Sequence, residues 1–192
     1  MIDPINITNF NQTTEELEEF LLFWVCAAGK NAKSAARALE RFLISIHDKN
    51  YKKFQPFLAI RKIPFKRLPS LMKEAGIGCF NQKAKTFWNL ANSKLNLKRC
   101  NTEELEEIYG IGMKTSRCFL IHSRKDVSCA GLDVHILKFL SDSGYDVPKQ
   151  TPPKKTYLKI EKIFLELVKQ SNKTVAEYDL DLWRTYSGNK NV

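Results

Sequence analysis

The residues from 105 to 116 have the types and spacing that suit phosphate binding. They predict a short helix that ends at Gly110, a hairpin with the sequence Gly110-Ile111-Gly112, and the start of a second helix. Glycine has no side chain and adopts positive φ, so a phosphate can approach the backbone N–H groups at the N-terminus of the second helix. Ile111 is expected to anchor the hairpin in the core. The same pattern also fits an ordinary corner between two helices.

A lysine and an aspartate follow the hairpin. Lys114 is separated from it by one residue, and Asp133 lies nineteen residues further on, in Gly131-Leu132-Asp133-Val134-His135. Apolar residues recur at helical spacing after Asp133, so its carboxylate lies where a helix begins and suits an N-cap. Lys114, beside the hairpin, suits a phosphate ligand. Their spacing and their combination with the hairpin favour a chemical role over these structural ones.

Hydrophobic periodicity predicts the helices that must position these residues. Thr13 and Glu16 form a capping-box pattern before the first helix, and Asn101 and Glu104 form another further along. Prolines between residues 51 and 69 favour short helices joined by turns. No stretch alternates apolar and polar residues for long enough to form a sheet, so we expect an all-α fold. The expected helices cover about residues 14–29, 32–46, 69–75, 82–93, 101–108, 114–122, 134–141 and 153–170.

We expect residues 1–192 to form a single catalytic unit with two lobes. Residues 30–135 are expected to form one lobe of central helices, with the helix-hairpin-helix at about residues 101–123. Residues 1–29 and 136–192 are expected to form the other, because the long helix 153–170 is expected to pack back beside the N-terminal helices.

The composition favours a polyanionic partner. Lys and Arg number 31 against 21 Asp and Glu, which gives a formal net charge of +10. A basic surface of this kind suits nucleic acid, although charge alone fits a merely basic protein equally well. The hydrophobic fraction of 43% is enough for a substantial core and excludes disorder as a description.

The cysteines argue against metal or cofactor sites, and the apolar segments argue against a membrane span. None of the five cysteines forms a C-x-x-C pair, so we expect no metal, no iron-sulfur cluster and no other cofactor. The most apolar stretch, residues 20–28, is too short to span a membrane, and residues 1–12 do not resemble a signal peptide. We therefore expect a cytoplasmic protein without a membrane partner, associated with the nucleoid if its source is a prokaryote.

Three segments, in this order along the chain, resemble the helix-hairpin-helix DNA glycosylase superfamily. The most specific is Gly110-Ile111-Gly112-Met113-Lys114 followed by Gly131-Leu132-Asp133, which is similar to the family's hairpin, catalytic lysine and catalytic aspartate. Residues 76–84 resemble the family's glycine, aromatic and Lys-Ala turn that touches DNA. Residues 26–31 lie where relatives place the residues that fill the gap left by a flipped base. The resemblance implies a two-lobed helical fold with the active site in the cleft between the lobes.

The resemblance implies that the chain flips a damaged base out of duplex DNA and cleaves its N-glycosidic bond. Lys114 would be the nucleophile that forms a Schiff base with the sugar and then allows β-elimination of the strand, provided that its surroundings favour the neutral amine. Asp133 would stabilise the positive charge that develops on the sugar. Relatives that only remove the base typically lack this lysine, so Lys114 favours a glycosylase that is also a lyase.

The resemblance also assigns contacts with DNA and with the flipped base. Cys79 or Phe80 is the expected wedge from the turn at Gly78. The other expected DNA contacts are Lys30, Asn31, Gly78, Lys83, Gly110, Gly112, Thr115 and His135. Trp183, Asp179 and Phe119 are the expected base-pocket residues, although the C-terminal aromatic segment also suits a final helix that docks Leu182 and Trp183 into the core.

The expected substrate is 8-oxoguanine in double-stranded DNA, and the protein is expected to be a monomer. Endonuclease III relatives usually carry four clustered cysteines near the C-terminus, whereas this chain has no cysteine after Cys129. A chain of this length without a cluster looks more like the small 8-oxoguanine DNA glycosylases with lyase activity of archaea and some bacteria. A glycosylase for oxidised pyrimidines or alkylated bases, and a non-catalytic helix-hairpin-helix DNA-binding module, remain the alternatives.

Overall fold

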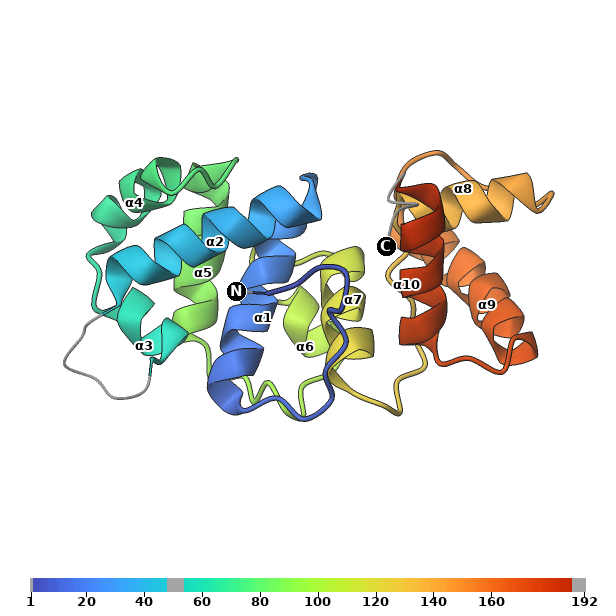
Figure 1. Ribbon diagram of the computed structural model, residues 1–192, viewed down its shortest axis with the longest axis horizontal. Coiled ribbons are helices and arrows are strands. Elements are labelled where there is room, and N and C mark those ends of the chain that lie inside the picture. The colour runs from blue at the N-terminus through green and yellow to red at the C-terminus, as the bar shows by residue number, and fades with distance from the viewer. Residues whose placement is uncertain (1, 48–53, 188–192) are drawn as a thin grey trace.

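The computed structural model describes residues 2–47 and 54–187, which are helical and contain no strand (Figure 1). The all-α prediction is therefore confirmed. The first residues of the stretch from 51 to 69, in which short helices were expected, lie outside the described residues. The helices are α1 (Thr14–Ala27), α2 (Ala32–Ile46), α3 (Pro56–Arg61), the 3-10 turn η1 (Phe65–Arg67), α4 (Leu68–Glu74), α5 (Phe80–Asn92), α6 (Thr102–Glu106), α7 (Met113–Ser123), α8 (Val134–Asp142), α9 (Lys154–Gln170) and α10 (Val175–Tyr186).

Side-chain caps fix the starts of several helices. Thr13 accepts a hydrogen bond from the backbone of Glu16, whose carboxylate accepts one from the backbone of Thr13 in return. Asn101 and Glu104 form the same reciprocal pair at α6. Both capping boxes lie where the sequence predicted them, because they depend on residues only three positions apart. The helix α6 is shorter than expected, since it ends at Glu106 before the hairpin.

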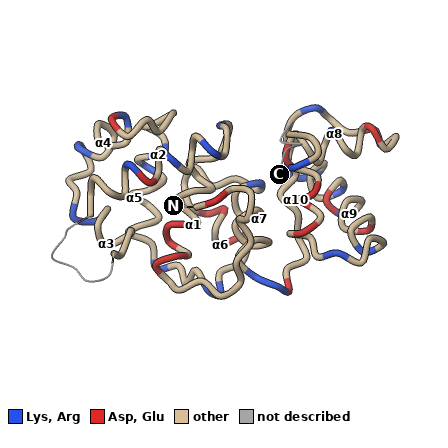
Figure 2. Tube along the Cα trace, in the orientation of Figure 1, with Lys and Arg blue, Asp and Glu red and all other residues tan. Residues whose placement is uncertain are grey.

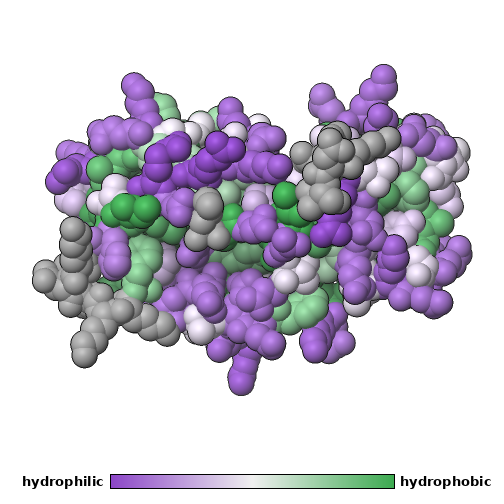
Figure 3. Space-filling view, in the orientation of Figure 1, coloured by the Kyte–Doolittle hydropathy of each residue, from purple (hydrophilic) through white to green (hydrophobic). Residues whose placement is uncertain are grey.

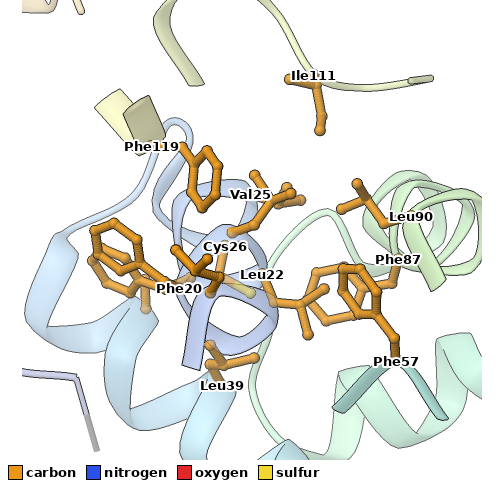
Figure 4. Close-up of a cluster of buried hydrophobic side chains, with 14 of the residues drawn as sticks. Phe20, Leu22, Val25, Cys26, Leu39, Phe57, Phe87, Leu90, Ile111 and Phe119 are labelled. Carbon is orange, nitrogen blue, oxygen red and sulfur yellow. The ribbon is translucent and has the colours of Figure 1, made fainter. Parts of the chain in front are cut away.

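The first hydrophobic core surrounds α1 and gathers side chains from α1 to α7 (Figure 4). Seven residues of α1 are buried, so this helix is apolar on most of its circumference and is suited to a central position. Leu22, Val25 and Cys26 lie in the cluster shown in Figure 4, where Phe87 and Leu90 of α5 approach from one side. Residues 2–129, as far as they are described, form what we call the large lobe.

The second core lies between α8, α9 and α10 and includes Ile136, Leu140, Tyr157 and Phe164. Residues 130–187 form the small lobe, on the right in Figure 1. The predicted grouping of residues 1–29 with the C-terminal helices is therefore wrong, because α1 is the centre of the large lobe. The expectation that α9 packs beside the N-terminal helices is also wrong, since its buried face belongs to the second core.

Contacts made by α10 help to join the lobes at their boundary. The helix α10 packs on α7 as well as on α8 and α9, and its Leu180 lies against the first core while Leu182 lies in the second. The guanidinium of Arg184 donates a hydrogen bond to the carbonyl of Ile5, at 3.0 Å, and so fastens the segment before α1 to α10.

Polar side chains cover most of the face shown in Figure 3, and hydrophobic side chains reach the surface near the boundary between the lobes. Lys and Arg occur along both lobes rather than at one end (Figure 2). No helix among the described residues is both long and apolar enough to cross a membrane.

Candidate active site

A cavity of about 660 Å³ lies between the lobes, with walls from α1, α7, α8 and α10 and from the turn before α2. Its lining includes Trp24, Lys114, Asp133, Asp179 and Trp183, which the sequence places far apart. The cavity therefore joins chemical groups from both lobes, as the cleft between lobes was expected to do.

Lys114 lies in the first turn of α7 and faces Asp133 across the cavity wall. The distance between Lys114 Nζ and Asp133 Oδ2 is 4.0 Å, and the side chains are 36% and 17% exposed, respectively. Cys118 and His122 line the same cavity, because residues four and eight positions after Lys114 share its face of α7. The pair is thus partly shielded from water but open to a ligand in the cavity.

Asp133 is the N-cap of α8, as its position in the sequence indicated. One carboxylate oxygen, Oδ1, accepts hydrogen bonds from the backbone N–H groups of His135 at 2.8 Å and Ile136 at 3.0 Å. The other oxygen faces Lys114. The cap holds the carboxylate in a fixed direction, so one residue serves the helix with one oxygen and the cavity with the other.

Burial raises the pKa of the Asp133 carboxyl above its ordinary value of 3.8. The positive charge of Lys114 lowers this pKa, whereas the negative charge of Asp179 raises it, and burial is the largest effect. An ionised Asp133 therefore weakens the folded state at neutral pH. This penalty is absent below the ordinary pKa and grows as the pH rises through the raised pKa of the folded state.

Asp133→Asn is consequently expected to stabilise the protein at pH 7, by about 1 kcal/mol, as relief of a strained functional position commonly does. Asparagine is an equally good N-cap, so the helix start is preserved. The stability difference should shrink towards pH 3, where the aspartate of the native chain is protonated. Urea denaturation at both pH values measures it, with the exposed Asp126→Asn as control. A variant less stable than the native chain at pH 7 would show that the attraction of Lys114 outweighs burial.

Gly131 lets the segment before Asp133 lie directly against α7. A Cβ atom at this position would collide with the Sγ atom of Cys118. The backbone can therefore pass close enough to α7 for Asp133 to face Lys114. The sequence motif contained this glycine, but its partner on α7 could not be read from the sequence.

His122 also lines the cavity, although it was not among the residues predicted for the site. Its ring is buried and stacks on Trp24, with ring centroids 5.5 Å apart. Its Nδ1 is hydrogen-bonded to the Thr8 hydroxyl at 2.8 Å and its Nε2 to Asp179 Oδ2 at 3.1 Å. His122 therefore connects α1, α7 and α10. Its spacing of eight residues from Lys114 was the signal that could have found it.

The three expected base-pocket residues lie in different places. Asp179 and Trp183 line the cavity. Phe119 does not, because it points to the opposite side of α7, is fully buried in the first core and packs against Phe20 with ring centroids 5.9 Å apart. The assignment of Phe119 to the base pocket is therefore corrected to a core residue.

The two glycines of the hairpin, Gly110 and Gly112, have different structural surroundings. Gly110 has a φ of +84°, and a Cβ there would collide with the Thr86 hydroxyl of α5. Gly112 is the N-cap of α7 and is exposed, with open space around it. Thr115 is buried, so its side chain does not reach a phosphate and this predicted contact is corrected. Ile111 is buried in the first core and anchors the hairpin as expected.

The glycine-containing segment at residues 76–84, which resembles the family's turn at DNA, contains both exposed and buried residues. Cys79 is exposed and has a φ of +54°, where it precedes α5. Phe80 is half-buried against the first core, with the Lys73 ammonium 5.8 Å from its ring centroid. Lys83 is buried, and its ammonium donates a hydrogen bond to the Cys26 carbonyl at 2.7 Å. Lys83 is therefore corrected from a phosphate ligand to a link between α5 and the end of α1.

The remaining predicted contacts stand at the cavity mouth. Lys30 and Asn31 are exposed and line the cavity, and the Asn31 side chain caps α2 by accepting from Ser34 N at 3.1 Å. His135, two residues after Asp133, lines the cavity as well. Among the described residues no group of three or more His, Cys, Asp or Glu side chains could hold a metal ion.

Solved structures with this fold include two 8-oxoguanine DNA glycosylases. The Methanocaldococcus jannaschii 8-oxoguanine glycosylase/lyase, solved in complex with DNA containing 8-oxoguanine, is 25% identical, with a TM-score of 0.75 over 95% of this chain and 86% of that chain. The Thermotoga maritima 8-oxoguanine DNA glycosylase is also 25% identical, with a TM-score of 0.70 over 93% and 83%. An endonuclease III–DNA covalent intermediate is 16% identical, with a TM-score of 0.66, and shares the fold.

A family model extends this likeness from the fold to the sequence itself. The model describes the helix-hairpin-helix 8-oxoguanine DNA glycosylases and matches residues 3–173, which include the hairpin, Lys114 and Asp133. The match covers most of the chain and reaches into both lobes. Together with the cavity between the lobes, it establishes that the chain belongs to the 8-oxoguanine DNA glycosylase family, whose members act in base excision repair.

Proposed function

We propose that the chain excises 8-oxoguanine from double-stranded DNA and cleaves the strand at the resulting site, with Lys114 as nucleophile and Asp133 as its carboxylate partner. The observation on which the proposal depends is the approach of Lys114 Nζ to Asp133 Oδ2, 4.0 Å apart, in a cavity between the lobes. A module that only binds DNA has no need for a nucleophile and a carboxylate that face one another at a cavity wall.

The reaction would begin when the neutral amine of Lys114 attacks the C1′ atom of the flipped nucleotide. The new bond forms between Nζ and C1′, the bond between C1′ and the base breaks, and its electron pair leaves with the base, which takes up a proton. The ionised carboxylate of Asp133 would stabilise the positive charge on the sugar. Opening of the sugar ring gives a Schiff base, and loss of a C2′ proton then expels the 3′ phosphate by β-elimination.

The cavity between the lobes would hold the flipped base. Its volume is in the range of small-molecule sites, and the rings of Trp24 and Trp183 offer aromatic faces for stacking. The indole N–H of Trp24 is buried and has no hydrogen-bond partner within the described residues, so a turn of the ring towards the cavity would let it donate to a carbonyl oxygen of the base. Asp179 offers an acceptor to a base N–H. A purine with an added oxygen and an added N–H suits this pair of groups.

The DNA backbone would run past the cavity mouth. Gly112 exposes the N-terminus of α7 to a phosphate, and Lys30, Asn31 and His135 stand beside the opening. Cys79, exposed at its turn, is the better placed candidate for the wedge, because Phe80 is held against the core. We also propose that the two lobes act as a single catalytic unit in a monomer, in the compartment that contains the DNA.

The direct test is a panel of duplexes containing 8-oxoguanine, thymine glycol, an alkylated base or no damage, incubated with excess protein. Release of free 8-oxoguanine, strand cleavage at the same position and a borohydride-trapped adduct are the expected results. Release of thymine glycol without 8-oxoguanine would favour the oxidised-pyrimidine alternative. Tight binding to all duplexes without any base release would favour the non-catalytic DNA-binding module.

A further inference from the structure

A buried network of charged and polar side chains lies behind the catalytic pair, on the side away from the cavity. At its centre is Arg117 of α7, whose side chain is 5% exposed. Arg117 Nε donates to Glu161 Oε1 of α9 at 2.7 Å, and its other arm forms an ion pair with Glu106 of α6. The guanidinium also lies over the ring of Tyr157, 5.1 Å from the centroid. The network thus joins α6 and α7 of the large lobe to α9 of the small lobe.

Two side chains of α9, one helical turn apart, bind the backbone of the segment that leads to Asp133. The Glu161 carboxylate accepts a hydrogen bond from Ala130 N at 2.8 Å. The Tyr157 hydroxyl donates to the Ala130 carbonyl and accepts from Leu132 N, both at 2.8 Å. Residues 130–132 belong to no helix, so these side chains provide the partners that a helix would otherwise supply.

The next residue after this segment is Asp133. Its carboxylate direction depends on where the backbone of residues 130–132 lies, because the N-cap can form only if the chain enters α8 at the right place. Lys114 belongs to α7, and Arg117 of that helix is bound to the same Glu161. The positions of Lys114 and Asp133 therefore both depend on the same residue of α9, Glu161.

We propose that Tyr157 and Glu161 are positioning residues that hold the Asp133 carboxylate against Lys114. Neither side chain lines the cavity, so neither would touch DNA or the flipped base. The inference depends on the proposed function, because it concerns the rate of the step that Lys114 and Asp133 would perform. Small displacements of catalytic groups from distant changes lower rates by up to about a hundredfold, since the reacting atoms must lie within a narrow range of distances.

Tyr157→Phe is the sharpest test, because it removes one hydroxyl and keeps the ring beneath Arg117. The rate of 8-oxoguanine release under single-turnover conditions is expected to fall about tenfold to a hundredfold. The dissociation constant for the damaged duplex is expected to stay within about twofold. Tyr178→Phe is the matched control, because Tyr178 packs in the same core without lining the cavity, and its rate should stay within about twofold of the native chain.

A double-mutant cycle with Asp133→Asn separates positioning from a general structural effect. If Tyr157 acts through the Asp133 carboxylate, Tyr157→Phe should slow the residual release by less than about threefold in the Asp133→Asn background. An equal loss in both backgrounds would overturn the proposal, and so would an unchanged rate in Tyr157→Phe alone. Circular dichroism confirms that each variant is folded at the assay temperature.

Glu161→Gln provides a second route to the same conclusion. The amide oxygen can still accept from Ala130 N, whereas the charge that faces Arg117 is lost. A fall in the release rate that is again suppressed by Asp133→Asn would support the proposal, and a loss equal in both backgrounds would contradict it. These failures differ from a failure of the proposed function, in which the native chain itself would not release 8-oxoguanine.

Discussion

Lys114→Gln is expected to eliminate the borohydride-trapped adduct with 8-oxoguanine DNA and to slow base release by a factor on the order of a thousand or more. The glutamine side chain is only one bond shorter, and the electron pair of its amide nitrogen is delocalised and not nucleophilic, so no bond to C1′ can form. Binding of the damaged duplex should weaken only modestly, because the protein keeps its remaining positive charge. Trapping gels, release assays and a binding isotherm on the same duplex measure the three quantities.

The comparison variants for this experiment are Lys169→Gln and Lys30→Gln. Lys169 is exposed near the end of α9, away from the cavity, and its replacement should leave trapping unchanged. Lys30 lines the same cavity as Lys114 and is the other lysine in its wall among the described residues. An adduct that persists in Lys114→Gln but disappears in Lys30→Gln would assign the nucleophile to Lys30 and refute the role given to Lys114.

Arg117→Met is expected to lower the free energy of unfolding by about 3–5 kcal/mol, the range for removal of one partner from a buried ion network. Methionine fills much of the same volume, so the loss arises mainly from the carboxylates of Glu106 and Glu161, which would remain buried without a counter-charge. Burial lowers the pKa of Arg117, but its hydrogen bonds to Glu161 and Glu106 outweigh that effect and raise the pKa, so the native guanidinium stays charged. Denaturant unfolding followed by circular dichroism measures the change.

Lys173→Met is the matched control for this loss of charge. Lys173 pairs with Asp181 at 2.7 Å, but both side chains are close to half exposed, so its replacement should change the free energy of unfolding far less than Arg117→Met does. Addition of Glu161→Gln to Arg117→Met should recover part of the lost stability, because it removes one uncompensated charge. A loss below about 1 kcal/mol in Arg117→Met would mean that the network contributes little to stability.

The features that depend on neighbours in the sequence could be predicted. Helix starts follow from caps such as Thr13 and Asn101, whose partners lie three residues away. The hairpin and the pair Lys114 and Asp133 follow from short motifs and their separation. The N-cap at Asp133 was also predictable, since it needed only the start of an apolar periodicity.

The features that depend on distant contacts could not be predicted in this way. Lys83 and Arg117 look like surface residues in the sequence, yet the folded chain buries both, because a backbone carbonyl and two carboxylates from other helices meet them. Phe119 and Lys114 lie on the same helix but face opposite sides of it. They are only five residues apart, so a small error in the predicted orientation of the helix assigns a core residue to the cavity. The apolar residues of α1 indicated that this helix is buried, but which helices surround it depends on tertiary packing that its local sequence does not specify.

The positions of the cysteines determine which thiols of the protein are open to oxidation. Oxidants that convert guanine to 8-oxoguanine also attack protein thiols, and they do so through the thiolate form. Burial raises the pKa of Cys26 and of Cys129 to about 12 and raises the pKa of Cys100 and of Cys118 as well, so these four remain protonated and enclosed. The thiol most open to peroxide in the surrounding solution is therefore that of Cys79, which is exposed on the turn proposed to touch DNA.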